Sequence, residues 1–304
     1  MRAIALGIVL GVAVAGPAGA DGLEDLAFRP LVAEAGREIG IDLRAVSRPE
    51  TALPDGQPAL GPGAIAEVWL TEPTERYGHA VLGDGIEAGG LLVRLADGDS
   101  LTLSLPEAQV FEDLKPRLVD LDDDGRDEIL VVRSSQSSGA TLVAYGVVEG
   151  ALREAAKGPE RLTAHRWLNP VGAADFDGDG VLEVAYVETP HIGGVLRILS
   201  RQGDRLVQEA EANGFSNHAI GSRALGLSAI LDADGDGLPE ILLPDARRRA
   251  LRVMGFVDGT LRERAVFPLD TQIVGDFRLE DLDGNGLEGV VIPLSGDREL
   301  RLYR

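Results

Sequence analysis

The sequence predicts an all-β protein, because four acidic turns of one pattern recur along the chain and each precedes a short aliphatic run typical of a strand. The chain has 304 residues, of which 44% are hydrophobic and 4% aromatic. This length and composition permit a large buried core. A regular internal repeat decides the fold class before any single strand is assigned.

The four turns begin at Asp120, Asp175, Asp232 and Asp281. Successive starts are separated by 55, 57 and 49 residues (175 minus 120, 232 minus 175, 281 minus 232). This spacing is about the length of a four-stranded propeller blade. We therefore expect a β-propeller of four-stranded antiparallel blades, in which each acidic turn joins the first strand of a blade to the second.

The chemistry of the turns predicts a calcium site in each. Carboxylates at positions one, three and five can converge on one cation, Gly at position six allows a sharp turn, position seven can offer a backbone carbonyl, and position nine adds an acid. The oxygen donors suit Ca²⁺ better than a metal with soft ligands, and Mg²⁺ usually retains more of its water. The predicted ligands are Asp120, Asp122, Asp124, Arg126 and Glu128; Asp175, Asp177, Asp179, Val181 and Glu183; Asp232, Asp234, Asp236, Leu238 and Glu240; and Asp281, Asp283, Asn285 and Leu287.

An EF-hand begins with the same pattern but needs a bidentate Glu at position twelve and a helix on each side. Position twelve is Val131, Tyr186, Leu243 or Ile292, and none of these side chains can ligate calcium. The turns lead instead into strand-like runs such as residues 129–132 and 184–187. The fourth turn departs from the pattern, since Gly289 stands where the acid should be, so its metal occupancy is open.

The pattern Asp-x-Asp-x-Asp-Gly-x-x-Glu between two short strands resembles the FG-GAP/VCBS repeat family, over about residues 75 to 304. The resemblance implies a β-propeller with calcium loops between the first and second strands of each blade, as in the integrin head and many secreted bacterial proteins. Members include adhesins, lectin-like proteins and some lyases. The resemblance therefore implies the fold more closely than the function.

The whole chain is expected to divide into three parts. Residues 1–20 have a positive start, an apolar run and a small-residue end, as in a cleaved signal peptide. Residues 21–63 are expected to form an N-terminal extension ending in a Pro/Gly-rich linker, and residues 64–304 the propeller. A degenerate unit from Tyr77 would add a fifth blade, and a strand near residues 66–70 would close the ring.

Net charge and cysteine content exclude some classes of partner and of covalent attachment. The formal net charge of -21 argues against nucleic acid, whose binding depends on clustered Lys and Arg. The chain has no cysteine, which excludes disulfides and a lipid-anchored lipoprotein. We expect a periplasmic or secreted protein with no membrane span after signal cleavage and with Ca²⁺ as its cofactor.

A second group of polar residues is expected on the face opposite the calcium loops. Histidines precede the predicted inner strands or follow the second strand, and in antiparallel pairs these positions share one end. The candidate ligand-binding residues are Arg76, Tyr77, His79, His165, Arg166, Trp167, Asn169, His191, Asn217, His218 and Arg223, with Arg247, Arg248 and Arg249 on the same rim. They suggest a small anionic or carbonyl-rich ligand or a protein partner, although the same residues can also hold neighbouring blades together or form a three-histidine zinc site.

Three classes of function fit these features. A calcium-stabilised binding or interaction module is favoured, because no Gly-x-Ser-x-Gly, His-Glu-x-x-His or P-loop motif is present. A secreted lyase or hydrolase with a His/Arg/Tyr site at the mouth of the central channel is the alternative, and a structural adhesin is the third. Carbohydrate recognition is disfavoured by the low aromatic content, since sugars commonly stack on rings.

Overall fold

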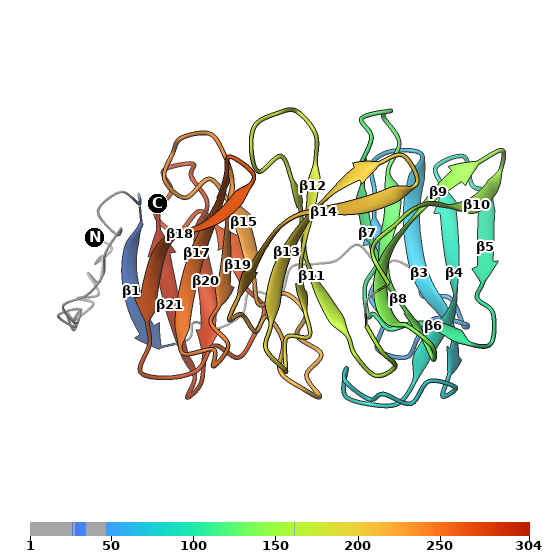
Figure 1. Ribbon diagram of the computed structural model, residues 1–304, viewed down its shortest axis with the longest axis horizontal. Coiled ribbons are helices and arrows are strands. Elements are labelled where there is room, and N and C mark those ends of the chain that lie inside the picture. Colours follow the sequence, from blue (N-terminus) through green and yellow to red (C-terminus); the bar gives the residue numbers. More distant parts are fainter. Residues whose placement is uncertain (1–25, 27, 35–46, 161) are drawn as a thin grey trace, which may run out of the picture.

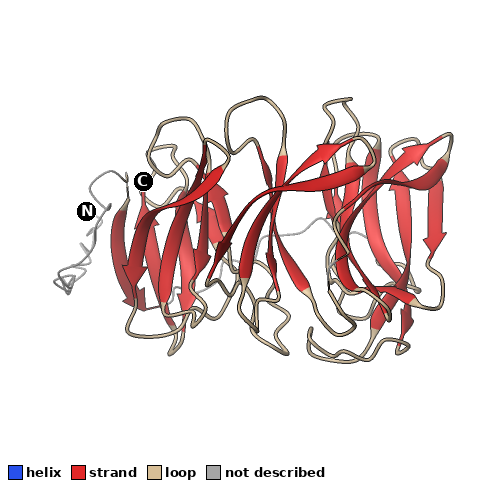
Figure 2. Ribbon diagram, in the orientation of Figure 1, coloured by secondary structure: helices blue, strands red, loops and turns tan. Residues whose placement is uncertain are grey.

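The computed structural model describes residues 26, 28–34, 47–160 and 162–304, so the signal peptide predicted for residues 1–20 lies outside the described part. Every regular element in this part is a strand, and none is a helix (Figure 2). Short runs rich in Val, Ile and Leu, separated by Gly- and Asp-containing turns, favour this outcome. The predicted all-β class is confirmed.

The described strands form three sheets, of 4, 13 and 4 strands, and their pairings divide into five successive antiparallel units of four. The first unit consists of β2 (Ala59–Leu60), β3 (Ile65–Thr74), β4 (Glu87–Leu95) and β5 (Ser100–Ser104). The second consists of β7 (Arg117–Val119), β8 (Glu128–Ser135), β9 (Gly139–Val148) and β10 (Ala151–Lys157). In each unit the strands pair in sequence order.

The third and fourth units repeat this plan. The third consists of β11 (Leu168–Ala174), β12 (Glu183–Glu188), β13 (Val195–Gln202) and β14 (Arg205–Asn213). The fourth consists of β15 (Ala229–Leu231), β16 (Glu240–Pro244), β17 (Ala250–Val257) and β18 (Thr260–Pro268). Figure 1 shows the third unit in the middle of the molecule, with the fourth and fifth at one side and the first and second at the other.

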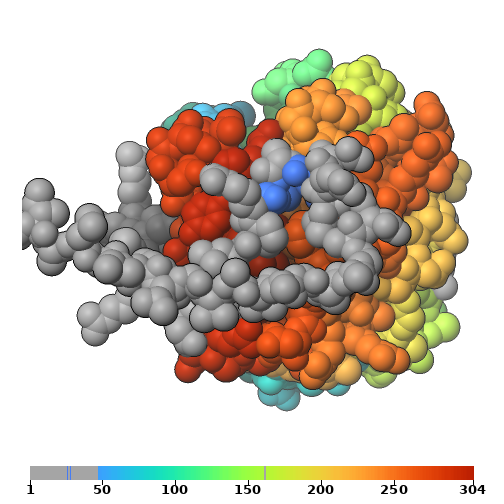
Figure 3. Space-filling view, turned by 90° about the vertical axis from the view of Figure 1, so that its left-hand side faces the viewer, coloured from blue at the N-terminus to red at the C-terminus, as the bar shows by residue number. Residues whose placement is uncertain are grey.

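The fifth unit is completed from the other end of the chain. It contains β19 (Arg278–Glu280), β20 (Gly289–Leu294), β21 (Arg298–Tyr303) and, as its outer strand, β1 (Arg29–Glu34). The pairing of β1 with β21 is antiparallel and runs from Arg29↔Tyr303 to Glu34↔Arg298. In Figure 3 the red surface of the last residues lies beside the orange surface of the fourth unit.

This pairing corrects the expected ring closure. The strand near residues 66–70 does not complete the last unit, because it lies within β3 and pairs with β4 in the first unit. Residues 77–85, expected to start that unit, instead form the connection between β3 and β4. The segment 21–63, expected to be an extension, contributes β1 and β2 to two different sheets. A six-residue strand that repeats no motif gives no sign of its distant partner.

Neighbouring units are joined by shared cores and by two strand contacts. β6 (Gln109–Phe111) pairs with both β4 and β8, and β10 makes one parallel bridge to β14, from Lys157 to Arg205. One apolar cluster spans the first three units, a second spans the third and fourth, and a third spans the fourth and fifth. Fully buried Phe111, Phe176 and Phe215 are among the largest of these core side chains.

Candidate functional site

The predicted calcium loops lie where the sequence places them, between the first and second strands of four units. In the third unit, β11 ends at Ala174 and β12 begins at Glu183, so the loop occupies the gap between them. The second, fourth and fifth units have the same arrangement. The acid at position nine is therefore the first residue of the second strand in the second, third and fourth units.

Three of these loops bring carboxylates together. The groups are Asp120, Asp122 and Glu128; Asp175, Asp177 and Glu183; and Asp232, Asp234 and Glu240, each with ligand atoms within 4.8 Å of one another. These are positions one, three and nine of the repeat. Each group could hold a metal ion, and carboxylate oxygens in this number suit Ca²⁺.

Backbone hydrogen bonds hold the three loops in one shape. The amide of position two donates to the Glu at position nine, from Leu121 at 2.9 Å, Phe176 at 2.9 Å and Ala233 at 2.7 Å. The amide of position six donates to the first Asp in each loop. The carboxylates are therefore oriented by the main chain before any ion arrives.

The predicted ligands at positions five and seven have a different role in this structure. Asp124, Asp179 and Asp236 lie outside the converging groups, and each accepts the amide of position seven, at 2.9, 2.8 and 2.8 Å respectively. The donors are Arg126, Val181 and Leu238. Ligation by the position-five carboxylates and by the carbonyls of position seven stays a prediction.

Burial acts against the charged form of the position-nine acids. Burial first, and then nearby aspartates, raises the pKa of both Glu183 and Glu240 to about 7. Burial also raises the pKa of Glu128, although the Leu121 amide and Arg201 oppose it. A bound divalent cation would favour the ionised forms.

Arginines already pair with two of the three loops. Arg201 lies 2.7 Å from Asp122 and 2.9 Å from Glu128 through one guanidinium nitrogen. Arg264 pairs with Asp234, and Arg304 lies 3.2 Å from Asp232. Among the described residues, no Lys or Arg pairs with the carboxylates of the 175–183 loop, which leaves this loop the most open to an external cation.

The fourth loop differs for a steric reason. Asp281, Asp283, Asn285 and Leu287 are exposed and belong to none of the converging groups. A Cβ on Gly289 would lie 2.4 Å from the Leu302 carbonyl oxygen and 3.0 Å from a Leu282 methyl group. The backbone of the neighbouring strand thus leaves no room for an acid at position nine.

A second site lies at the opposite end of the strands. Trp167 precedes β11 and Asp175 follows it, so about 23 Å of strand separates the two sites at 3.3 Å per residue. Trp167, with His79, Val81, His165, Arg166, Thr189, His191, Ile192 and Ile220, lines a cavity of about 230 Å³, here called the histidine pocket. The structure therefore brings together side chains that are more than 100 residues apart in the sequence.

The rings of this pocket contact one another in two groups. His165 lies 5.1 Å from Tyr77 and 5.3 Å from His79, measured between ring centroids. Trp167 stacks on His191 at 6.1 Å and meets His218 edge-on at 4.8 Å. His191 and His218 also share a hydrogen bond of 2.8 Å.

The loop that carries His191 is held by a close backbone contact. Gly194 has φ of +42°, and a Cβ on it would lie 1.6 Å from the Phe215 carbonyl oxygen. Only glycine allows this approach. The contact presses the 189–194 loop against the 215–218 segment, which is why His191 reaches His218.

Buried groups behind the pocket are paired. His79 contacts Glu112, a fully buried carboxylate that also accepts a hydrogen bond from Ser134. The Trp167 indole donates to the Glu112 carbonyl at 2.8 Å. Burial first, then the charge of Glu112, raises the pKa of Tyr77. Burial lowers the pKa of both His191 and His218 to about 4, so both imidazoles are neutral at pH 7.

Several predicted site residues lie next to the pocket but do not line it. Arg76 donates to the Gln109 carbonyl, and Arg223 pairs with Asp55 and Asp84. Asn169 and Asn217 are fully buried, and each donates to the other's backbone carbonyl. Arg76 thus ties the connection after β3 to β6, Arg223 ties the 214–226 segment to the first unit, and the two asparagines tie that segment to β11.

The predicted arginine rim contacts neighbouring segments. Arg248 donates to the Ser216 hydroxyl and the His218 carbonyl. The carbonyl of Arg247 accepts from Gln272, and Arg249 donates to the Asp270 carbonyl. The sequence did not indicate Glu112, Thr189, Ile192 or Ile220. Its only available signal was the acidic pair Glu112–Asp113 inside an otherwise strand-like stretch.

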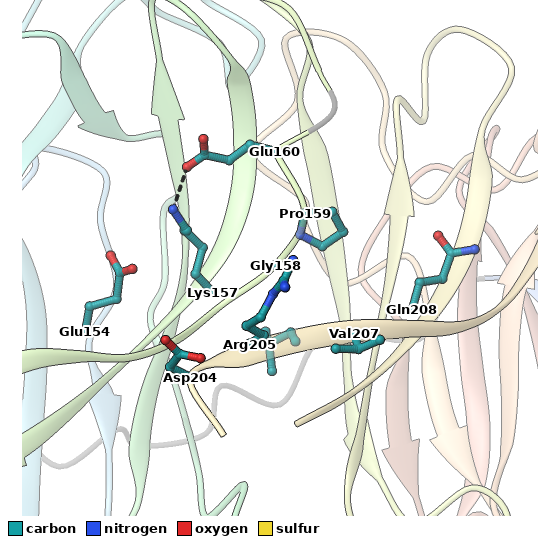
Figure 4. A pocket seen from close by; sticks show the side chains of 10 residues that line it. Glu154, Lys157, Gly158, Pro159, Glu160, Asp204, Arg205, Val207 and Gln208 are labelled. Atoms are coloured by element: carbon teal, nitrogen blue, oxygen red, sulfur yellow. Dashed lines mark hydrogen bonds and ion pairs between the residues drawn. The ribbon is translucent and has the colours of Figure 1, made fainter. Parts of the chain in front are cut away.

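A larger cavity than the histidine pocket lies elsewhere, at the outer strands of the second and third units (Figure 4). It measures about 680 Å³ and lies between the ends of β10 and β14. Its side chains carry mixed charge, and Lys157 pairs with Glu160 at 3.1 Å on one of its two lining segments. Its described residues form no converging set of ligand atoms of the kind found in the acidic loops.

No helix that could cross a membrane occurs in the described part of the chain. A search of curated proteins found no match.

Among the solved structures that resemble this chain, two are lyases with low TM-scores and low sequence identity. The rhamnogalacturonan lyase YesW aligns with a TM-score of 0.42 and 18% identity, over 70% of this chain and 43% of that one. The Bacillus licheniformis rhamnogalacturonan lyase PL11 aligns with a TM-score of 0.40 and 16% identity, over 66% of this chain and 47% of that one.

This chain thus spans less than half the length of either lyase. A family model gives a more direct result, because it matches residues that include two of the acidic loops. The segment from residue 120 to residue 186 matches the model of the FG-GAP-like repeat.

Proposed function

We propose that this chain is an exported, calcium-stabilised β-propeller of five blades that acts as a ligand-binding or protein-interaction module. The observation that carries the proposal is the recurrence of one carboxylate group at the same point of three successive units. Positions one, three and nine would hold each ion. Bound Ca²⁺ would supply positive charge that offsets about two carboxylates at each site in a chain of net charge -21.

Two features support the finer parts of the proposal. Five successive four-stranded antiparallel units, the last completed by β1, match the blade plan of a propeller. The signal-like residues 1–20 support a periplasmic or secreted location. The histidine pocket is the proposed ligand site, because its exposed and buried polar groups converge on one cavity.

The calcium proposal is tested by melting the mature protein in excess Ca²⁺, in EDTA and in Mg²⁺. A ligand that binds only the folded state adds about 2.7 kcal/mol per site at one hundred times its Kd, so three sites add about 8 kcal/mol. At roughly 2–4 °C per kcal/mol, this predicts a rise in Tm of roughly 15–30 °C. An identical Tm in Ca²⁺ and EDTA would mean that the acidic loops are solvated turns.

Catalysis at the same pocket is a second candidate, as a lyase or hydrolase. The favouring observation is that His79 contacts the buried Glu112 while His191 is neutral, an arrangement suited to proton transfer. The test is whether the purified protein has lyase or hydrolase activity. That activity should fall at least a hundredfold in His79→Gln, while the Tm of the variant stays unchanged. Activity that separates from the protein on a sizing column argues for the binding module.

A further inference from the structure

Two histidines that line the pocket each commit one ring nitrogen to an acceptor. His79 Nδ1 lies 2.5 Å from a Glu112 carboxylate oxygen, and His165 Nε2 lies 3.2 Å from the Tyr77 carbonyl oxygen. Carboxylates and carbonyls only accept, so these ring nitrogens donate. In the neutral ring the other nitrogen then carries a lone pair, which is Nε2 in His79 and Nδ1 in His165.

The third pocket histidine is fixed through a relay of two rings. His218 Nε2 lies 2.9 Å from the Ser222 carbonyl oxygen and must donate to it. His218 Nδ1 therefore accepts, and the nitrogen that donates to it at 2.8 Å is His191 Nε2. His191 Nδ1 is left with a lone pair. No described residue forms a hydrogen bond with His79 Nε2, His165 Nδ1 or His191 Nδ1.

The three lone pairs do not form a metal site. In the described part of the chain, the groups of three His, Cys, Asp or Glu atoms within 4.8 Å of one another are the three acidic loops, and none contains a histidine. A single ion ligated at about 2.0–2.1 Å would need closer nitrogens. Acceptors that are spread around a cavity instead suit a molecule with several hydrogen-bond donors.

The charge of the pocket indicates which hydrogen-bonding groups a ligand should carry. Among the described residues that line the pocket, Arg166 alone has a permanent charge, and its guanidinium donates to the His165 carbonyl at 3.2 Å. An ammonium ligand would be repelled by Arg166, and an anion would face the imidazole lone pairs. A hydroxyl group can donate to an imidazole and accept from Arg166 at the same time.

The rim adds apolar contact. Ile192 and Ile220 are 63% and 73% exposed, and both line the pocket. Trp167 is only 2% exposed, so its ring face is covered and a ligand does not need to stack on it. The low aromatic content of the chain therefore does not exclude sugar-like ligands here, because the imidazoles supply the recognition.

We propose that the histidine pocket binds one ring of a neutral polyhydroxylated ligand, such as a sugar or a cyclitol. His79, His165 and His191 accept hydrogen bonds from its hydroxyls, and Arg166 donates to one of them. The inference rests on the proposed binding function and names its ligand class. A cavity of about 230 Å³ is smaller than the roughly 300–1,000 Å³ of drug-sized sites, which limits the bound part to a single ring.

The test is isothermal titration of the mature Ca²⁺-loaded protein at pH 8 with methyl glycosides and myo-inositol. Matched probes are the fully O-methylated compounds, which keep the shape and lose every donor, together with acetate and phosphate. We expect saturable binding by at least one polyol, at least tenfold weaker binding of its methylated form, and no binding of the anions. Comparison with the linear oligosaccharide of the same sugar shows whether a free ring or a chain end binds, and either result supports ring recognition.

Variants separate the roles of the side chains. His191→Phe should weaken polyol binding at least tenfold, and Arg166→Gln should weaken it less. His165→Gly provides a second variant, because His165 has φ of +60° and glycine keeps that backbone without strain. Lys157→Gln, in the cavity of Figure 4, is the control and should leave binding unchanged.

Two results would overturn the inference. One is binding of anions but not polyols, lost in Arg166→Gln. The other is polyol binding that is unchanged in both histidine variants. The Ca²⁺-dependent rise in Tm is measured on the same samples, so a failure of ligand class is distinguished from a failure of the calcium scaffold.

Discussion

In the proposed calcium scaffold, Arg201 would compete with Ca²⁺ for the 120–128 loop, and its removal should tighten Ca²⁺ binding there. One guanidinium nitrogen holds the carboxylates of Asp122 and Glu128, at 2.7 and 2.9 Å. The corresponding oxygens of Asp177 and Glu183, in the next unit, have no cationic partner among the described residues. An ion that enters the 120–128 loop must therefore displace Arg201. An ion that enters the 175–183 loop has no such competitor among the described residues.

The magnitude follows from the burial of the pair. The side chains of Arg201 and Glu128 are 14% and 8% exposed, so this contact is largely desolvated, whereas Asp122 is 37% exposed and its contact is screened. A hydrogen bond to a charged group contributes about 1.5–3 kcal/mol, and we count one such contact. At about 1.4 kcal/mol per factor of ten, Arg201→Gln should lower the Kd of this loop by about 10- to 100-fold.

The assay is calcium titration calorimetry of chelator-treated protein, with Tm measured in EDTA. Arg201→Gln should also lower the Tm in EDTA, because two carboxylates lose their partner. Arg205→Gln removes the same charge from the same hairpin and should change neither quantity, since Arg205 forms no ion pair with a described carboxylate. A Kd that is unchanged or higher in Arg201→Gln would show that the arginine stays beside the bound ion, and the competition argument would be wrong.

Further predictions concern single carboxylates and one glycine. Glu183→Gln should remove one of three Ca²⁺ equivalents in calorimetry and about 2.7 kcal/mol of the Ca²⁺-dependent stability, while Asp179→Asn, outside the converging group, should lose less. Burial raises the pKa of Glu87 from 4.5 to about 9, so the free energy of unfolding should fall as the pH rises from 4.5 toward 9. In Glu87→Gln this fall should vanish, giving a higher Tm than wild type at pH 8 and an equal one at pH 4.5; parallel curves would contradict the assignment. Gly289→Glu restores the motif of the fourth loop but should lower Tm without adding a Ca²⁺ equivalent, because the Leu302 carbonyl occupies the space of its Cβ.

The repeat made the acidic loops and their flanking strands predictable, since position nine and the aliphatic run that follows it are local in sequence. The pairing of β1 with β21 was not, because residues 29–34 carry no motif and their partner lies at the other end of the chain. The role of residues 66–70 was wrong for the same reason, as hydrophobic alternation identifies a strand but not its neighbour.

The histidine pocket was foreseen only in outline. Antiparallel pairing places the start of β11 beside the end of β12, which put Trp167 and His191 near each other from the sequence. The hydrogen bonds that fix each ring depend on Glu112, Ser222 and the Tyr77 carbonyl, which come from connections of irregular shape. Their positions follow from tertiary packing, such as the contact of Gly194 with Phe215, and no local pattern encodes them.

Because residues 29–34 supply its outer strand, the fifth unit cannot be completed before residues 298–303 are synthesised. β1 emerges early and keeps an unpaired edge until residues 298–303 are available. A contact between segments so distant in sequence is slow to form, because the entropy of closing the intervening chain must be overcome first. A polypeptide that stays unfolded while it is moved between compartments would gain from this delay, since the sheet that joins β1 to β21 cannot form until residues 298–303 have arrived.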